Sequence, residues 1–249
     1  MGLTIHYRIK LKATDTKTGI VDAWRLVSRA HAFAMRLQNM GRVKRVGEIT
    51  CSREVLDQTI AFDRRLDFEG KWRMKLVTPH RGWVYHVNVG DGCEPVQLGL
   101  CRYPYTGPQV GPRRWAKIHS PQQAIWRLEG FCKTQYASQH GWDHFLACHR
   151  TALELIHYWS RTGAKVIIRD EGGYWPRLSE EKLRRSLGEY DGLTAAFAGA
   201  LKDAAGDDVG SIKAPIFHHP QFEKLEAHGL STHGRKIAQA VAAVKRLMP

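Results

Sequence analysis

The sequence has no run of about 18 consecutive apolar residues, so we expect no helix that spans a membrane. Its first residues also lack the apolar centre of a signal peptide. The five cysteines are odd in number and include no C-x-x-C pair, which argues against a disulfide framework and favours a reducing, cytoplasmic location. A zinc site assembled from Cys93, Cys101, Cys132 and the adjacent Cys148-His149 stays open, although structural zinc sites usually contain a closer pair of ligands.

Several sequence motifs that carry chemistry are also missing. There is no G-x-G-x-x-G fingerprint, no G-x-S-x-G elbow and no glycine-rich phosphate loop, which removes the simplest dinucleotide, hydrolase and nucleotide-binding interpretations. His140 and His144 have the spacing of a zinc protease motif, but glycine rather than glutamate follows the first histidine. No cofactor is therefore expected, and whether the protein is an enzyme stays open.

Acidic residues are scarce relative to basic ones. The 249 residues include 24 Asp and Glu against 38 Lys and Arg, for a formal net charge of +14. The first 120 residues hold 21 basic and 10 acidic side chains, and so carry +11 of that charge. A one-sided excess favours a polyanionic partner, of which nucleic acid is the commonest. The alternatives are a basic surface without a ligand, an anionic lipid surface, or a phosphorylated small molecule.

The periodicity of apolar residues predicts the order of the elements. We expect a strand over 3–12, a helix over 20–40 and a second strand over 43–51, then a short helix and loop over 52–70. Further strands are expected over 71–77, 83–89 and 96–102, followed by a long loop over 103–124. A strand over 126–136, a helix over 143–161 and a strand over 165–169 complete this part, and helices over 179–190, 193–205 and 231–248 follow.

This order predicts an α+β fold. It indicates an antiparallel-rich mixed sheet with helices on one face, related to the ferredoxin-like arrangement, with two strand–helix–strand units and an inserted hairpin. The expected domains are a basic α+β domain over 1–177 and a helical C-terminal subdomain over 178–249. The C-terminal helices are a candidate surface for a protein partner.

Three groups of residues are candidates for nucleic-acid binding, because arginine and lysine hold phosphates while tyrosine and tryptophan stack on bases. They are the long loop with its flanks (Arg102, Tyr103, Tyr105, Arg113, Arg114, Trp115 and Lys117), the cluster after the first helix (Arg42, Lys44 and Arg45), and the polar face of the first strand (Arg8 and Lys10). No helix-turn-helix or zinc-finger pattern occurs, so RNA or single strands are favoured. The alternative is that the loop aromatics anchor it on the core.

A second hypothesis is a metal-dependent phosphodiesterase or nuclease. Asp170 and Glu171 follow the last strand of the basic domain, a common place for carboxylates that hold Mg²⁺ or Mn²⁺. The alternative is a polar turn, completed by two glycines. His149 is a candidate catalytic base, although its place beside an apolar stripe favours a buried, hydrogen-bonded histidine. A third hypothesis is a non-catalytic subunit of a ribonucleoprotein or defence-type complex.

Overall fold

The structure is a computed structural model that describes residues 3–12, 17–66, 72–103, 125–205 and 214–246. Its elements follow in this order: β1 (Thr4–Lys12), α1 (Lys17–Asn39), β2 (Arg45–Val46), α2 (Arg53–Gln58), β3 (Ala61–Leu66), β4 (Trp72–Val77), β5 (Arg81–Asn88), β6 (Val96–Arg102), β7 (Ile125–Lys133), the 3₁₀ helix η1 (Gln135–His140), α3 (Trp142–Arg161), β8 (Lys165–Asp170), α4 (Glu180–Ala205), the 3₁₀ helix η2 (Pro215–His218) and α5 (Phe222–Lys245).

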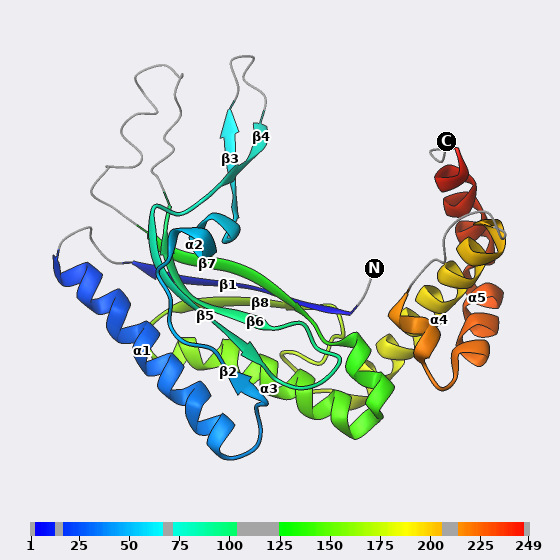
Figure 1. Cartoon of the computed structure of the whole chain (residues 1–249), viewed down its shortest axis with the longest axis horizontal. Helices are drawn as coiled ribbons and strands as arrows, with labels where there is room; N and C mark the ends of the chain where they lie inside the picture. Colours follow the sequence, from blue (N-terminus) through cyan, green and yellow to red (C-terminus); the bar gives the residue numbers. More distant parts are fainter. Residues whose placement is uncertain (1–2, 13–16, 67–71, 104–124, 206–213, 247–249) are drawn as a thin grey trace.

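The predicted α+β class is confirmed. Six strands form one sheet in the order β2-β5-β6-β7-β1-β8, and every pairing between them is antiparallel. Helices α1 and α3 lie against one face of this sheet, whereas the β3–β4 hairpin extends beyond its edge (Figure 1). The relation to the ferredoxin-like arrangement stays a prediction.

The alternation of residues along β1 divides the sheet into a buried and an open face. Leu3, Ile5 and Ile9 are fully buried on the side of the helices, while His6 between them is exposed. The helices complete the core with residues at steps of three and four, as expected for amphipathic helices. Those on α1 are Ala23, Val27, Ala30, Ala34 and Leu37, and those on α3 include Phe145, Cys148, Ala152, Leu155, Ile156 and Trp159.

A tyrosine fills a gap in the middle of the sheet. Among the described residues, strands β6 and β7 pair only through Cys101–Arg127 and Arg102–Trp126, and a gap separates the rest of the two strands. The Tyr7 hydroxyl reaches across this gap and donates a hydrogen bond of 2.5 Å to the Gln97 carbonyl. Gly130 makes the crossing possible, because a Cβ atom there would lie 2.5 Å from the Tyr7 oxygen. Burial raises the pKa of Tyr7 well above its ordinary value, so the hydroxyl stays protonated as a donor.

The C-terminal helices differ from the prediction. A single helix, α4, replaces the two helices expected over 179–205, and α5 begins at Phe222 rather than near residue 231. Gly192 in α4 and Gly229 in α5 allow the two helices to pack closely, and neither glycine ends a helix. A Cβ atom at Gly229 of α5 would lie 1.9 Å from the Gly192 carbonyl oxygen of α4, so only glycine permits this crossing. Two smaller differences are that β2 has only two residues and that 61–66 forms a strand.

The first half of α4 belongs to the main body of the protein. Leu183 and Leu187 are buried in its core, whereas the second half of α4 and α5 form two small apolar clusters of their own. Asp191 accepts a hydrogen bond of 2.7 Å from the Gln135 side chain, whose oxygen accepts one of 3.0 Å from the Leu3 amide. The domain boundary at 177 stays a prediction. Among the described helices, none is long and apolar enough to cross a membrane.

Asp191 should make the stability of the protein depend on pH. Burial raises its pKa to about 6, above the ordinary value of 3.8. The stability that its carboxyl contributes is therefore present below about pH 4 and is lost as the pH rises through 6. We expect Asp191→Asn to increase the free energy of unfolding at pH 7.5 by about 2 kcal/mol and to have little effect at pH 4, measured by urea denaturation.

The matched control is Glu189→Gln on the same helix, where the side chain is exposed. It should change the free energy of unfolding by less than about 0.5 kcal/mol at either pH. An Asp191→Asn protein that is less stable than the parent at pH 7.5 would contradict the account.

Candidate nucleic-acid interface

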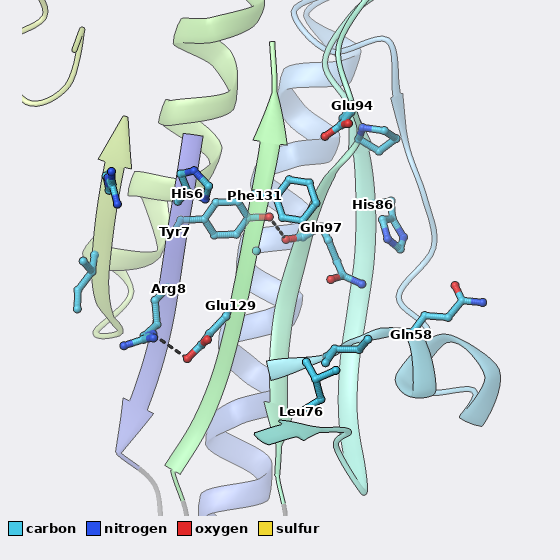
Figure 2. Close-up of a pocket in the computed structure, with 15 residues that line it drawn as sticks. His6, Tyr7, Arg8, Gln58, Leu76, His86, Glu94, Gln97, Glu129 and Phe131 are labelled. Carbon is cyan, nitrogen blue, oxygen red and sulfur yellow. Dashed lines mark hydrogen bonds and ion pairs between the residues drawn. The ribbon is translucent and has the colours of Figure 1, made fainter. Parts of the chain in front are cut away.

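The face of the six-stranded sheet that α1 and α3 leave uncovered is here called the open face. Three strands place their outward side chains on it in register. Its cross-strand rows, written in the order β7–β1–β8, are Phe131–His6–Arg169, Glu129–Arg8–Ile167 and Arg127–Lys10–Lys165. Figure 2 views this face, with side chains of β1, β5, β6 and β7 directed toward the viewer and helices behind the sheet. The alternation of residues along the first strand predicts which of its side chains lie on this face. Their neighbours on β7 and β8 are determined by the strand order.

The row at one end of the open face consists of three cations. Arg127 and Lys165 are the direct partners of Lys10 on its two sides. Like charges directly opposite one another are unfavourable in a sheet. Partial burial, followed by the charges of Arg8 and Arg127, lowers the pKa of Lys10. The row therefore has an electrostatic reason to bind an anion, which would relieve this repulsion.

The row at the other end combines an aromatic ring with polar groups. Phe131 is 55% exposed although it lies within a central strand. His6, its partner on β1, contacts Glu171, with 3.1 Å between Nε2 and Oε1. Arg169 lies on the far side of His6. The Lys133 ammonium lies 5.9 Å from the centroid of the Phe131 ring. An exposed ring beside a cation is the arrangement on which an unpaired base stacks while its phosphate is held.

The row between them is internally paired. Arg8 Nε lies 2.7 Å from Glu129 Oε1, so part of the charge of Arg8 is neutralised by the protein itself. Ile167, the third member, is 46% exposed. The row thus separates the cation end from the aromatic end by a salt bridge and an apolar side chain.

The open face is hollowed into a cleft of about 970 Å³. Its floor includes Tyr7, Gly130 and Gln97, the residues at the gap between β6 and β7. One wall is apolar, since Ile60 after α2 and Leu76 on β4 both line the cleft and are exposed. Figure 2 shows Leu76 and Gln58 across the cleft from Arg8 and Glu129. The cleft therefore offers apolar contacts on one side and charged contacts on the other.

The predicted cluster after the first helix lies elsewhere. Arg42 forms a salt bridge with Glu154 of α3, and Lys44 forms one with Asp91 in the turn after β5. Both residues line a second cleft beside α3, and Arg45 is an exposed residue of β2 at the sheet edge. The structure therefore does not bring Arg42, Lys44 and Arg45 together with Arg8 and Lys10.

Of the candidate residues in the long loop and its flanks, the structure describes Arg102 and Tyr103. Tyr103 is 8% exposed, its hydroxyl donates a hydrogen bond to the Thr59 carbonyl, and the Arg127 guanidinium lies 4.8 Å from its ring centroid. Tyr103 thus packs as an anchor and supports Arg127, and it is not placed to stack on a base. Arg102 is half-buried at the end of β6, and burial lowers its pKa. Tyr105, Arg113, Arg114, Trp115 and Lys117 lie outside the described residues.

The two carboxylates of the nuclease hypothesis point to different places. Asp170 is fully buried, where Oδ1 accepts the Gly172 amide at 2.8 Å and Oδ2 accepts the Trp175 amide at 2.9 Å. Glu171 instead accepts the Thr4 amide at 3.2 Å and faces His6 on the open face. The two carboxylates therefore do not face a common site where they could bind a cation together. The carboxylate of Asp170 instead stabilises the turn after β8.

His149 belongs to a buried series of polar side chains that contact one another. Its Nδ1 is hydrogen-bonded to the Thr134 hydroxyl at 2.8 Å, and its Nε2 lies 3.4 Å from Asp170 Oδ2. The order hydroxyl, imidazole, carboxylate is that of a nucleophile, a base and an orienting acid. However, Thr134 and His149 are both 0% exposed, so no substrate reaches the hydroxyl. The structure places His149 as a buried, hydrogen-bonded histidine, the alternative that its position beside the apolar stripe favours.

The scattered cysteines are all free thiols. Within the part of the chain that the structure describes, no three or more His, Cys, Asp or Glu side chains are grouped as metal ligands would be. His149 is engaged with Thr134 and Asp170, which separates it from the zinc set considered above.

The sequence predicted strands at the positions of β7 and β8, but it did not identify the outward side chains that these strands place on the open face. Arg127, Phe131, Lys165 and Arg169 alternate with buried or half-buried residues on β7 and β8, which is the available signal. Comparison of the chain with protein-family models, with curated proteins and with solved structures finds no match in any of the three.

Proposed function

We propose that the protein binds single-stranded nucleic acid, RNA in preference to DNA, across the open face. The observation that carries the proposal is the row of three directly opposed cations, Arg127, Lys10 and Lys165, on the same open face as the exposed ring of Phe131. A phosphate would add negative charge beside these three cations, and a base would stack on the exposed ring of Phe131.

The dimensions of the open face suit an extended strand. His6 and Lys10 are four residues apart on β1, which corresponds to about 13 Å. One strand lying along β1 therefore contacts the aromatic end and the cation end together. Polar groups that line the cleft, His6, His86 and Gln97, are available to a ribose hydroxyl, which supports RNA over DNA. A protein partner bound through the C-terminal helices stays a prediction.

Phe131→Ala tests the aromatic part of the proposal. We expect this change to weaken binding of a fluorescent RNA of about 10 nucleotides by about 10-fold, because it removes one base-stacking surface. The free energy of unfolding should change little, since more than half of the ring is exposed. Fluorescence anisotropy measures the affinity, and unlabelled single-stranded DNA and duplex RNA serve as competitors.

Met40→Ala is the matched control, because Met40 is 68% exposed at the end of α1, away from the open face. It should leave the affinity unchanged. The affinity of the parent protein should fall with salt with a logarithmic slope of about −2, since each phosphate neutralised on a single strand contributes about 0.7. Binding that does not depend on salt, or equal affinity in the Phe131→Ala and parent proteins, contradicts the proposal.

A further inference from the structure

One histidine on the open face is in contact with a carboxylate. His6 Nε2 lies 3.1 Å from Glu171 Oε1, and the side chain of His6 is 46% exposed. His6 also lines the cleft of about 970 Å³ in the open face. Figure 2 shows its imidazole on the same side of the sheet as the ring of Phe131. A titratable ring is therefore accessible to a molecule bound in the cleft.

Hydrogen bonds to the start of β1 fix the position of Glu171. Its backbone amide donates a hydrogen bond of 3.1 Å to the Thr4 carbonyl, and its Oε2 accepts one of 3.2 Å from the Thr4 amide. The other carboxylate oxygen, Oε1, is the one that contacts His6. Because the carboxylate is held by the backbone on one side, it can orient the imidazole on the other, as the acid of a catalytic histidine–carboxylate pair does.

The contact with Glu171 defines the tautomer of His6. An ionised carboxylate only accepts hydrogen bonds, so Nε2 carries the hydrogen in this contact. In the neutral ring the other nitrogen, Nδ1, then has a lone pair. Within the described residues the ring makes no second hydrogen bond. Nδ1 is therefore available to accept a proton from a bound substrate, while Glu171 stabilises the charged ring that results.

The neighbours of His6 on the adjacent strands suit a nucleotide. Phe131 and Arg169 are its direct partners on β7 and β8, and the Cβ atoms of such partners lie about 5 Å apart. Arg169 is exposed, and no ion pair joins it to a carboxylate in the part of the chain that the structure describes. Arg8, two residues along β1, is instead paired with Glu129. A base stacked on Phe131 thus brings its ribose and phosphate to the imidazole of His6 and the guanidinium of Arg169.

We propose that the open face cleaves the RNA that it binds, with His6 as the general base and Glu171 as the residue that positions it; this inference rests on the proposed function. His6 Nδ1 takes the proton of a ribose 2′-hydroxyl, and the 2′-oxygen attacks the phosphorus of the adjacent 3′-phosphodiester. The bond from phosphorus to the 5′-oxygen of the next nucleotide breaks, and a water molecule donates a proton to that oxygen. The hydroxide that remains takes the proton from His6, which makes the ring neutral again. The products are a 2′,3′-cyclic phosphate and a 5′-hydroxyl.

Arg169 provides the positive charge that this reaction needs. The phosphorus carries more negative charge during the attack than it does in the phosphodiester, and a guanidinium already in place stabilises that charge as it develops. The reaction also requires the 2′-hydroxyl, so DNA in the same cleft stays intact. Glu171 takes part as the hydrogen-bond partner of His6, and not as a metal ligand beside Asp170.

The test follows cleavage of a fluorescent RNA of about 10 nucleotides by excess full-length protein at pH 7, with mass spectrometry of the fragments. We expect fragments that end in a 2′,3′-cyclic phosphate and fragments that begin with a 5′-hydroxyl. EDTA should leave the rate unchanged, because no step uses a metal ion. The same RNA with 2′-O-methyl groups throughout should stay intact, and fluorescence anisotropy with this RNA measures the affinity of each variant.

His6→Ala should lower the rate constant by about 100-fold or more, since a general base contributes at least that much. Its affinity for the 2′-O-methyl RNA should stay within about 3-fold of the parent, because Phe131 and the cations remain. Added imidazole should restore part of the rate in His6→Ala, an effect that a structural role of His6 would not produce. Glu171→Gln should lower the rate constant about 10-fold at unchanged affinity. The matched control is His218→Asn, an exposed histidine of η2 outside the cleft, which should keep the rate of the parent.

The outcomes separate this inference from the proposed function. RNA that binds to the parent protein and stays intact overturns the inference while the proposed function stands, whereas a complete absence of binding overturns both. Fragments with 3′-hydroxyl and 5′-phosphate ends, or cleavage by His6→Ala at the rate of the parent, also overturn the inference.

Discussion

Lys10→Glu is expected to weaken RNA binding by about 30-fold and, at the same time, to make the protein slightly more stable. The substituted carboxylate would lie directly between Arg127 and Lys165, so it removes one phosphate contact and repels the others. The same carboxylate turns two repulsive cross-strand pairs into attractive ones, which should add about 0.5 kcal/mol to the free energy of unfolding. The slope of log affinity against log salt should decrease by about 1. Anisotropy titrations at several salt concentrations and urea denaturation measure the three quantities.

The control variant, Arg25→Glu, makes the same change of charge on α1, on the other side of the sheet. Arg25 on α1 is 72% exposed and lies 3.9 Å from Asp22, so Arg25→Glu changes the net charge equally without touching the open face. We expect its affinity to stay within about 3-fold of the parent, because exposed charges beyond a Debye length are screened. If both variants weaken binding equally, the net charge of the protein, and not the row, determines affinity.

Asp170→Ala is expected to lower the free energy of unfolding by about 3 to 5 kcal/mol. The buried carboxylate satisfies the amides of Gly172 and Trp175 and faces His149, and its removal leaves these groups without an acceptor. Burial raises the pKa of Asp170, but His149 and the two amides together lower it below the ordinary value. The stability that the carboxylate contributes is therefore present above about pH 4 and is lost as the pH falls below it. Urea denaturation at pH 7 and pH 4 measures both effects.

Glu171→Gln is the companion variant. Glu171 is partly exposed and contacts the Thr4 amide and His6, so this change should cost less than about 1 kcal/mol. An Asp170→Ala protein as stable as the parent would show that the carboxylate does not organise the turn. Any loss of function in Asp170→Ala should also be compared with its loss of stability before the residue is assigned a chemical role.

The sequence predicted the main elements because their signals are local. The strict alternation over 3–12 identified β1 with both of its faces, and the stripe over 20–40 identified α1. Signals failed where tertiary packing overrides them. One expected helix ends at 190 and the next begins at 193, but α4 continues through Gly192. The carbonyl of Gly192 lies where α5 crosses α4, and the absence of a side chain at Gly229 lets the two helices meet.

The candidate site was predicted only in part, for a geometrical reason. Arg8 and Lys10 were identified from β1 alone, whereas Arg127 and Lys165 become the neighbours of Lys10 only through the order β7-β1-β8. Arg42 and Lys44 were predicted as a separate cluster for the same function. The structure places them beside α3, away from the open face, where they pair with Glu154 and Asp91. Adjacent residues of an extended chain point to opposite faces. The side chain of Asp170, the last residue of β8, is therefore buried, while that of Glu171, the next residue, is partly exposed.

The most direct test of the open face as the binding surface is photo-crosslinking with a single-stranded RNA that contains 4-thiouridine, followed by mass spectrometry of the crosslinked peptides. We predict crosslinks to the outward residues of β1 and β7, with Phe131 and His6 among them, and their loss when unlabelled RNA competes. Crosslinks confined to the helical side, such as the cluster of Arg42, Lys44 and Arg45, or to the C-terminal helices, with none on β1 or β7, would contradict the account.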